Sequence, residues 1–207
     1  PSDKELEQRL EAIRYSEEQG LLDTAKELRV KLSKDSIMSY ADTAIPPKVK
    51  KLIAAPGRWV LRGHLGSGGM GTVYRTEDLM LHKQAAIKVF VPRDNESFST
   101  ELSKRFNREG RLLAKLSTPY VVRVSQAGFS EQGGFIAMDL VDGQDLADTL
   151  NTRKEAHAVD EMSRVGLDVA NGLAAIHEAG IVHRDIKPGN ILFSKRLGHH
   201  IIADFGL

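Results

Sequence analysis

The sequence contains no cysteine. Disulfide bonds, thiolate nucleophiles and cysteine-ligated zinc are therefore excluded. No apolar run is long enough to cross a bilayer, and the charged N-terminal segment does not have the pattern of a signal peptide. The formal net charge is only +1 at pH 7, so charge alone predicts no attraction to nucleic acid or to a membrane surface. From these absences we expect a cytoplasmic protein with no nucleic-acid partner and no membrane segment.

The composition is that of a globular chain, with 41% hydrophobic and 28% charged residues in a length of 207. Residues 1–33 predict two short helices that form a hairpin, with Gly20 as the stop between them. The first helix is predicted by an apolar stripe of Leu6, Leu10 and Ile13. The second is predicted by a stripe of Leu21, Ala25, Leu28 and Leu32. We expect the stripes to pack on the neighbouring domain, and homodimerisation through the hairpin is the alternative.

Residues 34–57 have the composition of a linker, because proline and glycine punctuate them at Pro46-Pro47 and Pro56-Gly57. A short basic helix is expected at residues 48–53. From Trp59 the sequence changes to β-rich runs around a cluster of glycines. A folded domain is therefore expected to begin at residue 58.

The glycine cluster is LGSGGMGTV, which consists of Leu65, Gly66, Ser67, Gly68, Gly69, Met70, Gly71, Thr72 and Val73. A dinucleotide-binding fingerprint would need a helix after the last glycine, but the residues that follow favour a strand. A P-loop would need a lysine directly after the last glycine, and Thr72 stands there. The pattern indicates a glycine-rich β-hairpin whose backbone N–H groups can approach phosphate oxygens.

A lysine in the next apolar strand, AAIKV, could point at phosphates held by the glycine turn. The alternative for Lys88 is an ordinary surface lysine on an edge strand. Glu109 lies near the apolar side of a helical segment and could pair with Lys88, or it could be a solvated helix residue. These residues do not decide between the alternatives by themselves.

The segment HRDIKPGN brings together groups suited to phosphate chemistry. The carboxylate of Asp185 can orient or accept a hydroxyl proton, and Lys187 can neutralise a transferring phosphoryl group. Asn190, and Asp204 after the next strand, have oxygen atoms that can ligate magnesium. His199-His200 could suggest a metal site, but adjacent strand residues point in opposite directions, so we expect an exposed pair in a turn.

These motifs occur in the order found in protein kinases, which the sequence resembles from Trp59 to Leu207: LGSGGMGTVYR, AAIKV, HRDIKPGNIL and DFG. Details of the first and third motifs are most similar to the bacterial branch of eukaryotic-type serine/threonine kinases. The resemblance implies an α+β fold. In that fold, residues 58–140 form a β-rich N-lobe with the family's αC helix, and residues 141–207 form an incomplete helical C-lobe.

The resemblance also implies the roles of the site residues. ATP and Mg²⁺ would be the cofactors, with residues 65–73 covering the phosphates and Lys88 contacting them while paired with Glu109. Asp185 would be the catalytic base, Lys187 would steady the γ-phosphate, and Asn190 and Asp204 would hold magnesium. Adenine would lie among side chains and backbone of the residues that line the family's pocket: Val73, Ala86, Met138, Asp139, Val141 and Leu192.

Further residues refine the expected function. Lys187 matches the serine/threonine pattern, which implies a protein substrate phosphorylated on serine or threonine. Arg184 suggests control by phosphorylation, because an arginine can pair with a phosphate bidentately. The family's regulatory stack maps onto Leu113, Val124, His183 and Phe205. A nucleotide-binding pseudokinase scaffold and a small-molecule phosphotransferase are the alternative functions.

Kinases of this family continue beyond the DFG motif, so we expect the chain to be a fragment with weak or no activity alone. Without the helices that follow in the family, we expect Ile186, Ile191, Leu192 and the helix at residues 167–176 to expose apolar surface.

Overall fold

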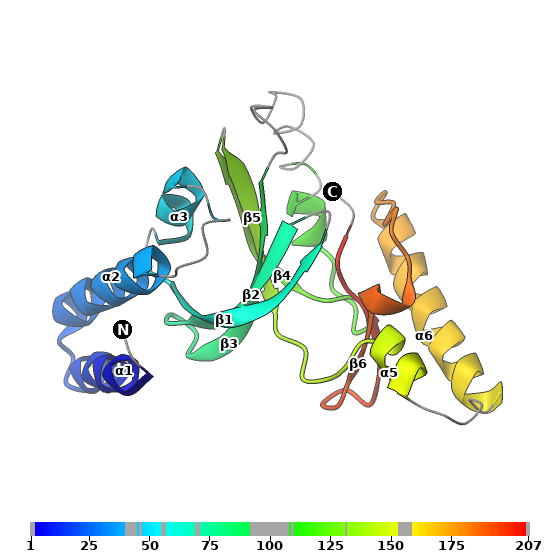
Figure 1. Ribbon diagram of the computed structural model, residues 1–207, viewed down its shortest axis with the longest axis horizontal. Coiled ribbons are helices and arrows are strands. Elements are labelled where there is room, and N and C mark those ends of the chain that lie inside the picture. The colour runs from blue at the N-terminus through cyan, green and yellow to red at the C-terminus, as the bar shows by residue number, and fades with distance from the viewer. Residues whose placement is uncertain are drawn as a thin grey trace. The chain divides into compact units, whose positions relative to one another are not determined.

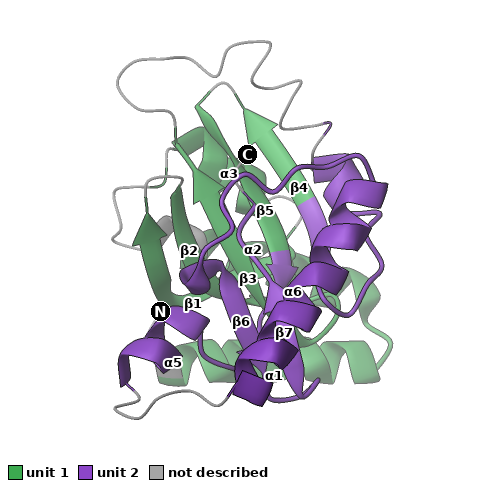
Figure 2. Cartoon of the chain, turned by 90° about the vertical axis from the view of Figure 1, so that its right-hand side faces the viewer, with its two compact units in different colours: residues 1–104, 127–137 green, residues 105–126, 138–207 purple. Residues whose placement is uncertain are grey.

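A computed structural model describes residues 3–39, 45, 47–54, 57–68, 71–91, 108, 110–130, 132–152 and 159–205. The chain forms two compact units (Figure 2). Unit 1 consists of residues 1–104 and 127–137, and unit 2 consists of residues 105–126 and 138–207. Within the described ranges, no helix combines the length and the apolar character needed to cross a membrane.

Unit 1 is built on a five-stranded sheet with the order β1-β2-β3-β5-β4 (Figure 1). The strands are β1 (Trp59–Gly68), β2 (Gly71–Asp78), β3 (Lys83–Phe90), β4 (Val124–Ser130) and β5 (Gly133–Asp139). β1, β2 and β3 form an antiparallel meander. The buried carboxylate of Asp78 shapes the β2–β3 turn, where it accepts hydrogen bonds from two turn N–H groups and from Arg58.

The first two helices form the expected hairpin, α1 (Asp3–Glu18) and α2 (Leu22–Ser39). Gly20 ends α1 with φ +73°, and the N–H groups of Gly20 and Leu21 bond back to the carbonyls of Glu17 and Ser16. This is the double hydrogen bond of a Schellman cap, which favours glycine at the left-handed position. Most residues of the two apolar stripes pack together with two residues of the sheet, Val60 and Leu79. Leu21 was expected in the second stripe, but it precedes α2 and is 52% exposed. The expected packing on the neighbouring domain is therefore confirmed.

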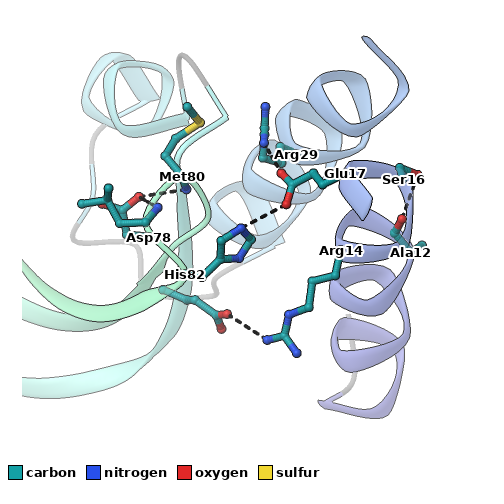
Figure 3. Close-up of polar contacts among 10 residues, drawn as sticks. Ala12, Arg14, Ser16, Glu17, Arg29, Asp78, Met80 and His82 are labelled. Atoms are coloured by element: carbon teal, nitrogen blue, oxygen red, sulfur yellow. Dashed lines mark hydrogen bonds and ion pairs between the residues drawn. The ribbon is translucent and has the colours of Figure 1, made fainter. Parts of the chain in front are cut away.

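Polar contacts surround this apolar seam. Glu17 of α1 forms an ion pair with Arg29 of α2, and its carboxylate lies 3.0 Å from Nε2 of His82 in the β2–β3 turn (Figure 3). Arg62 of β1 bonds to Glu77 of β2 and lies 3.1 Å from Glu7 of α1. The Ser33 hydroxyl donates to the carbonyl oxygen of Trp59, so α2 is hydrogen-bonded to the start of β1.

A third helix, α3 (Pro47–Ala54), covers one face of the same sheet. Its buried residues Val49 and Ile53 join a cluster that contains the inward-facing residues of β1, β2, β3 and β5: Trp59, Leu61, Tyr74, Ala85, Ile87, Val89, Phe135 and Ala137. The short basic helix expected at residues 48–53 is therefore confirmed, and the buried half of this helix contributes to the core of unit 1.

Unit 2 contains the helices α5 (Leu146–Thr152) and α6 (Val159–Glu178), the short helix η1 (Pro188–Asn190), and the antiparallel pair β6 (Ile191–Ser194) and β7 (His199–Ile202). Gly172 of α6 lets the helix approach β7 closely, because a Cβ there would lie 2.8 Å from the side chain of Ile202.

The expected exposure of apolar residues in unit 2 was partly wrong. Ile191 is buried with Leu146 of α5 and Val165 of α6, and Ile176 is also buried. Leu192 is half-buried. Ile191 is therefore covered by neighbours within unit 2 itself. Ile186 and Leu167 are exposed, as expected.

Candidate active site

Two bulges in β1 determine which way the glycine hairpin faces. The register between β1 and β2 shifts between Leu61 and Gly63 and again between His64 and Gly66. Directly opposite residues of an antiparallel pair have side chains on the same face of the sheet. The pairs Gly63↔Arg75, Gly66↔Val73 and Gly68↔Gly71 therefore lie on one face.

This glycine face continues onto β3. Val73 pairs with Lys88 and Arg75 with Ala86, so both β3 residues lie on the same face as the glycines. A Cβ added at Gly63, Gly66 or Gly68 would meet no heavy atom within 4 Å. The face is therefore a strip of open backbone that ends at Val73, Ala86 and Lys88, and a phosphate chain can approach its N–H groups.

Gly71 ends the described part of the turn. Its φ is +132°, and a Cβ there would collide with the carbonyl oxygen of Val89 on β3. Any other residue at this position would be strained. Gly69 and Met70, which were expected to cover phosphates, lie outside the described residues. Leu65 and Ser67 are exposed, and Thr72 is half-buried.

Lys88 is a buried lysine, with 3% of its surface exposed. Its Nζ lies 5.0 Å from the ring centroid of Phe90, two residues further along the same strand face. This cation–π contact helps to hold the ammonium group on the glycine face. Glu109, the expected partner of Lys88, lies outside the described residues, and Arg108 and residues 110–113 on either side are helical.

In unit 2, a buried histidine organises the loop that carries the candidate catalytic residues. His183 Nδ1 lies 3.4 Å from the N–H of Asp185, and Nε2 lies 3.0 Å from the carbonyl oxygen of Ala203. The network therefore places the ring proton on Nε2, because Nδ1 accepts from Asp185. The same ring packs against Phe205 with centroids 4.8 Å apart.

Asp185 is the centre of a small polar cluster. Lys187 Nζ lies 2.7 Å from Asp185 Oδ2, and the amide nitrogen of buried Asn190 donates to both the carboxylate and the carbonyl oxygen of Asp185. The hydrogen bonds from Lys187 and Asn190 hold the pKa of Asp185 below its usual range. The bond to Asp185 in turn raises the pKa of Lys187. Since Asn190 uses its nitrogen within the loop, its amide oxygen is the atom that could ligate a metal.

Asp204 is connected to this cluster through the backbone. The N–H of the preceding residue, Ala203, donates to the carbonyl oxygen of Asn190. The carbonyl oxygen of Ala203 accepts a hydrogen bond from His183. Asp204 has a left-handed backbone with φ 61°, and Arg184 has φ 67°. Left-handed conformations cost free energy in residues other than glycine and are frequent at functional sites. Hydrogen bonds thus connect the side chains of Asp185, Lys187 and Asn190, and the backbone contact of Ala203 with Asn190 joins them to the residue before Asp204.

Comparisons with known proteins identify the family. The sequence profile of the protein kinase domain matches residues 59–207. The chain belongs to the protein kinase family. It is 38% identical over 160 residues to a probable serine/threonine-protein kinase, pknA2, of Bifidobacterium longum, covering 73% of this chain and 20% of that protein. It is 40% identical over 154 residues to the serine/threonine-protein kinase PknL of Mycobacterium tuberculosis, covering 72% of this chain and 37% of that protein.

Among solved structures, the kinase domain of Mycobacterium tuberculosis PknI is similar, with a TM-score of 0.64 and 31% identity. The match covers 72% of this chain and 59% of the solved one. The kinase resemblance and the α+β kinase fold predicted from sequence are therefore confirmed. The chain spans only part of the length of each of these relatives.

The remaining kinase positions expected to surround adenine lie in strands or directly after them. Ala86 lies in β3, Met138 and Asp139 end β5, Val141 follows, and Leu192 lies in β6. The N–H of Asp139 donates to the carbonyl oxygen of Arg123, which fixes the end of β5. Of the expected regulatory stack, all four side chains are buried, and the contact between His183 and Phe205 is present.

The pair His199-His200 differs from the expected exposed turn. Both residues lie in β7 and are half-buried, and their rings have different partners. His199 packs on Tyr120, whereas His200 bonds to the carboxylate of Asp168 through its backbone N–H and its ring. Among the described residues, no three or more histidines and carboxylates come together in a group that could hold a metal ion. Asp168 gave no sequence signal for this role, because it lies on an ordinary amphipathic helix.

Proposed function

We propose that the protein is an ATP-dependent serine/threonine protein kinase. The observation that carries the proposal is the cluster of Asp185, Lys187 and Asn190, joined through Ala203 to Asp204. A base, a cation and two metal-ligating oxygens in one connected cluster suit phosphoryl transfer to a hydroxyl group. The names of the relatives support the same activity.

In unit 1, we propose that the strip of open backbone receives the phosphates of ATP. The phosphates would approach N–H groups of residues 65–73, and Lys88 would contact them from β3. The support is the face shared by Gly63, Gly66, Gly68 and Lys88. We also propose that Lys88 pairs with Glu109, and that Val73, Ala86, Met138, Asp139, Val141 and Leu192 surround adenine.

In unit 2, we propose that Asp185 orients the substrate hydroxyl and accepts its proton as the hydroxyl oxygen bonds to the γ-phosphorus. The bond from that phosphorus to the oxygen bridging to the β-phosphate breaks, and ADP leaves. A pKa below the usual range keeps the Asp185 carboxylate ionised at neutral pH, so it is ready to accept a hydrogen bond. Lys187 would neutralise charge on the transferring group.

Asn190 and Asp204 are the residues that we propose to hold Mg²⁺, with the amide oxygen and the carboxylate as ligands. When bound, magnesium neutralises charge on the phosphates. The donor set fits this ion, because magnesium prefers oxygen ligands and takes few of them from protein. The amide nitrogen of Asn190 is engaged by Asp185, which orients the amide oxygen away from that bond.

Calorimetric titration of the 207-residue chain with ATP, with and without Mg²⁺, tests this function. We expect magnesium-dependent binding that Asp204→Asn and Lys88→Met each abolish. Asp168→Asn is the matched control, because it removes a carboxylate of unit 2 that bonds to His200. Equal binding by wild type and Asp204→Asn would contradict the metal assignment, and no ATP binding by wild type would contradict the function for this chain.

Transfer of labelled γ-phosphate to a generic protein substrate then separates the alternatives. We expect weak serine/threonine phosphorylation that Asp185→Asn abolishes. ATP binding without transfer to any acceptor would favour a pseudokinase scaffold, and transfer to small molecules alone would favour a metabolite kinase. The intact set of Lys88, Asp185, Asn190 and Asp204 favours the active protein kinase.

The domain boundaries and the oligomeric state remain predictions: a hairpin at 1–33, a linker at 34–57, a kinase domain at 58–207, and homodimerisation through the hairpin. The hairpin stripe is already buried within unit 1, so a dimer would have to use the exposed face of α1 and α2. Light scattering of the chain at several concentrations measures this directly. A constant monomer mass would contradict homodimerisation.

A further inference from the structure

The side of the glycine hairpin opposite to the open strip carries a chain of polar side chains. Ser67 Oγ lies 3.1 Å from Thr72 Oγ1, and His64 Nε2 lies 2.8 Å from Ser67 Oγ. Ser67 and Thr72 are direct partners across the two strands. These three side chains, His64, Ser67 and Thr72, are called the polar brace below.

The bulge between His64 and Gly66 makes the polar brace possible. In a regular strand, residues three apart point to opposite faces of the sheet. The register shift places one additional residue in β1, so His64 and Ser67 lie on the same face. The same shift moves Gly66 and Gly68 to the other face. One irregularity therefore produces both the open glycine strip and the brace behind it.

The brace is anchored on the core of unit 1. His64 pairs with Tyr74 across the strands, and the two rings meet edge to face with centroids 6.0 Å apart. Tyr74 is fully buried in the cluster beneath α3. A continuous path of contacts thus runs from the core through His64 and Ser67 to Thr72, close to the tip of the hairpin.

We propose that His64, Ser67 and Thr72 are positioning residues that hold the ends of β1 and β2 at Gly66, Gly68 and Gly71 in the arrangement that receives nucleotide phosphates. This inference rests on the proposed function. Glycines permit close approach of phosphate but leave the backbone with many accessible conformations. Hydrogen bonds on the rear face restrict those conformations before the nucleotide arrives, which lowers the entropic cost of binding. The brace itself touches no phosphate, because it lies on the face opposite to Lys88.

The test compares ligands with and without phosphates on the 207-residue chain. Calorimetry measures the Kd of Mg-ATP and of adenosine for wild type, Ser67→Ala and Thr72→Val, which remove one hydroxyl each. Ser130→Ala is the matched control, since it removes a hydroxyl that bonds across the β4–β5 turn of the same sheet. Thr72→Ser restores the hydroxyl without the methyl group and serves as the conservative variant.

We expect Ser67→Ala and Thr72→Val to weaken Mg-ATP binding about two- to tenfold, the range for loss of one hydrogen bond. Adenosine binding and the melting temperature should not change, because the hydrogen bonds of the brace are exposed and act only on the residues that would receive phosphates. Ser130→Ala should bind Mg-ATP as wild type does, and Thr72→Ser, which keeps the hydroxyl, should bind it more tightly than Thr72→Val.

Each contrary outcome has a distinct meaning. Equal Mg-ATP affinity in all variants would refute the brace while leaving the proposed function intact. An equal loss of affinity for ATP and for adenosine would show a general structural effect and would also refute the brace. No binding of either ligand by wild type would contradict the proposed function, and the brace proposal would be rejected with it.

Discussion

Substitution of Leu32 tests whether the N-terminal hairpin belongs to the core of unit 1. The Leu32 side chain is 0% exposed and lies in the cluster with Leu10, Val60 and Leu79. Leu32→Ala removes Cγ and its two methyl groups and leaves a cavity, which typically costs about 2–5 kcal/mol. Leu22→Ala on the same helix is the matched control, because Leu22 is 68% exposed and its truncation should cost less than about 0.5 kcal/mol.

The protein contains an intrinsic fluorescence probe for this experiment. Its single tryptophan, Trp59, is 1% exposed in unit 1, and the residue after Leu32 hydrogen-bonds to its carbonyl oxygen. Urea unfolding followed by tryptophan fluorescence therefore reports on unit 1. Since m is about 1–3 kcal/mol per molar urea for small proteins, the Leu32→Ala midpoint should fall by about 1 M or more. Equal midpoints for Leu32→Ala and Leu22→Ala would refute the packing of the hairpin on the sheet.

Two further predictions concern unit 2. Lys187→Ala should raise the pKa of Asp185 toward its usual value, because the Lys187 bond is the largest cause of the lowered pKa. In wild type, Asp185 therefore keeps its negative charge to a lower pH than an ordinary aspartate and is protonated only below that pH. Carboxyl NMR titration measures this, and an unchanged pKa in Lys187→Ala, with Lys195→Ala as the control, would contradict the pairing. Gly166→Ala, where a Cβ meets nothing within 4 Å, should stabilise α6 by about 0.5–1 kcal/mol. Gly172→Ala, whose Cβ would lie 2.9 Å from a carbonyl oxygen, should instead cost about 1–3 kcal/mol through overpacking. Hydrogen exchange of the α6 amides distinguishes the two variants. Equal changes in amide protection for both variants would contradict the close approach of α6 and β7.

The sequence motifs predicted the family and the fold, because each motif depends on a local pattern of residue types. The meander from Trp59 to Phe90 follows from β-rich runs around glycines, and the cap at Gly20 follows from the rule for left-handed helix ends. The cluster around Asp185 was also predictable, since its members lie within five residues of one another.

Features that depend on register or on tertiary packing were not predictable. Nothing in the amino-acid sequence of β1 indicates the two bulges, although they determine on which face of the sheet each glycine lies. The half-buried His200 was missed because its partner, Asp168, lies 32 residues earlier in the chain. Ile191 was expected to be exposed, and its burial depends on side chains from α5 and α6.

The packing of α3 on the sheet has a practical consequence for expressing this protein. The family match begins at Trp59, but the apolar surface around Ile87 and Val89 is covered by Val49 and Ile53, which precede it. A recombinant fragment cut at residue 59 would also uncover Val60 and Leu79. Contiguous apolar patches of this kind drive self-association of otherwise soluble domains. We therefore expect a fragment that begins at residue 59 to self-associate, whereas a chain that keeps the N-terminal helices should remain in solution.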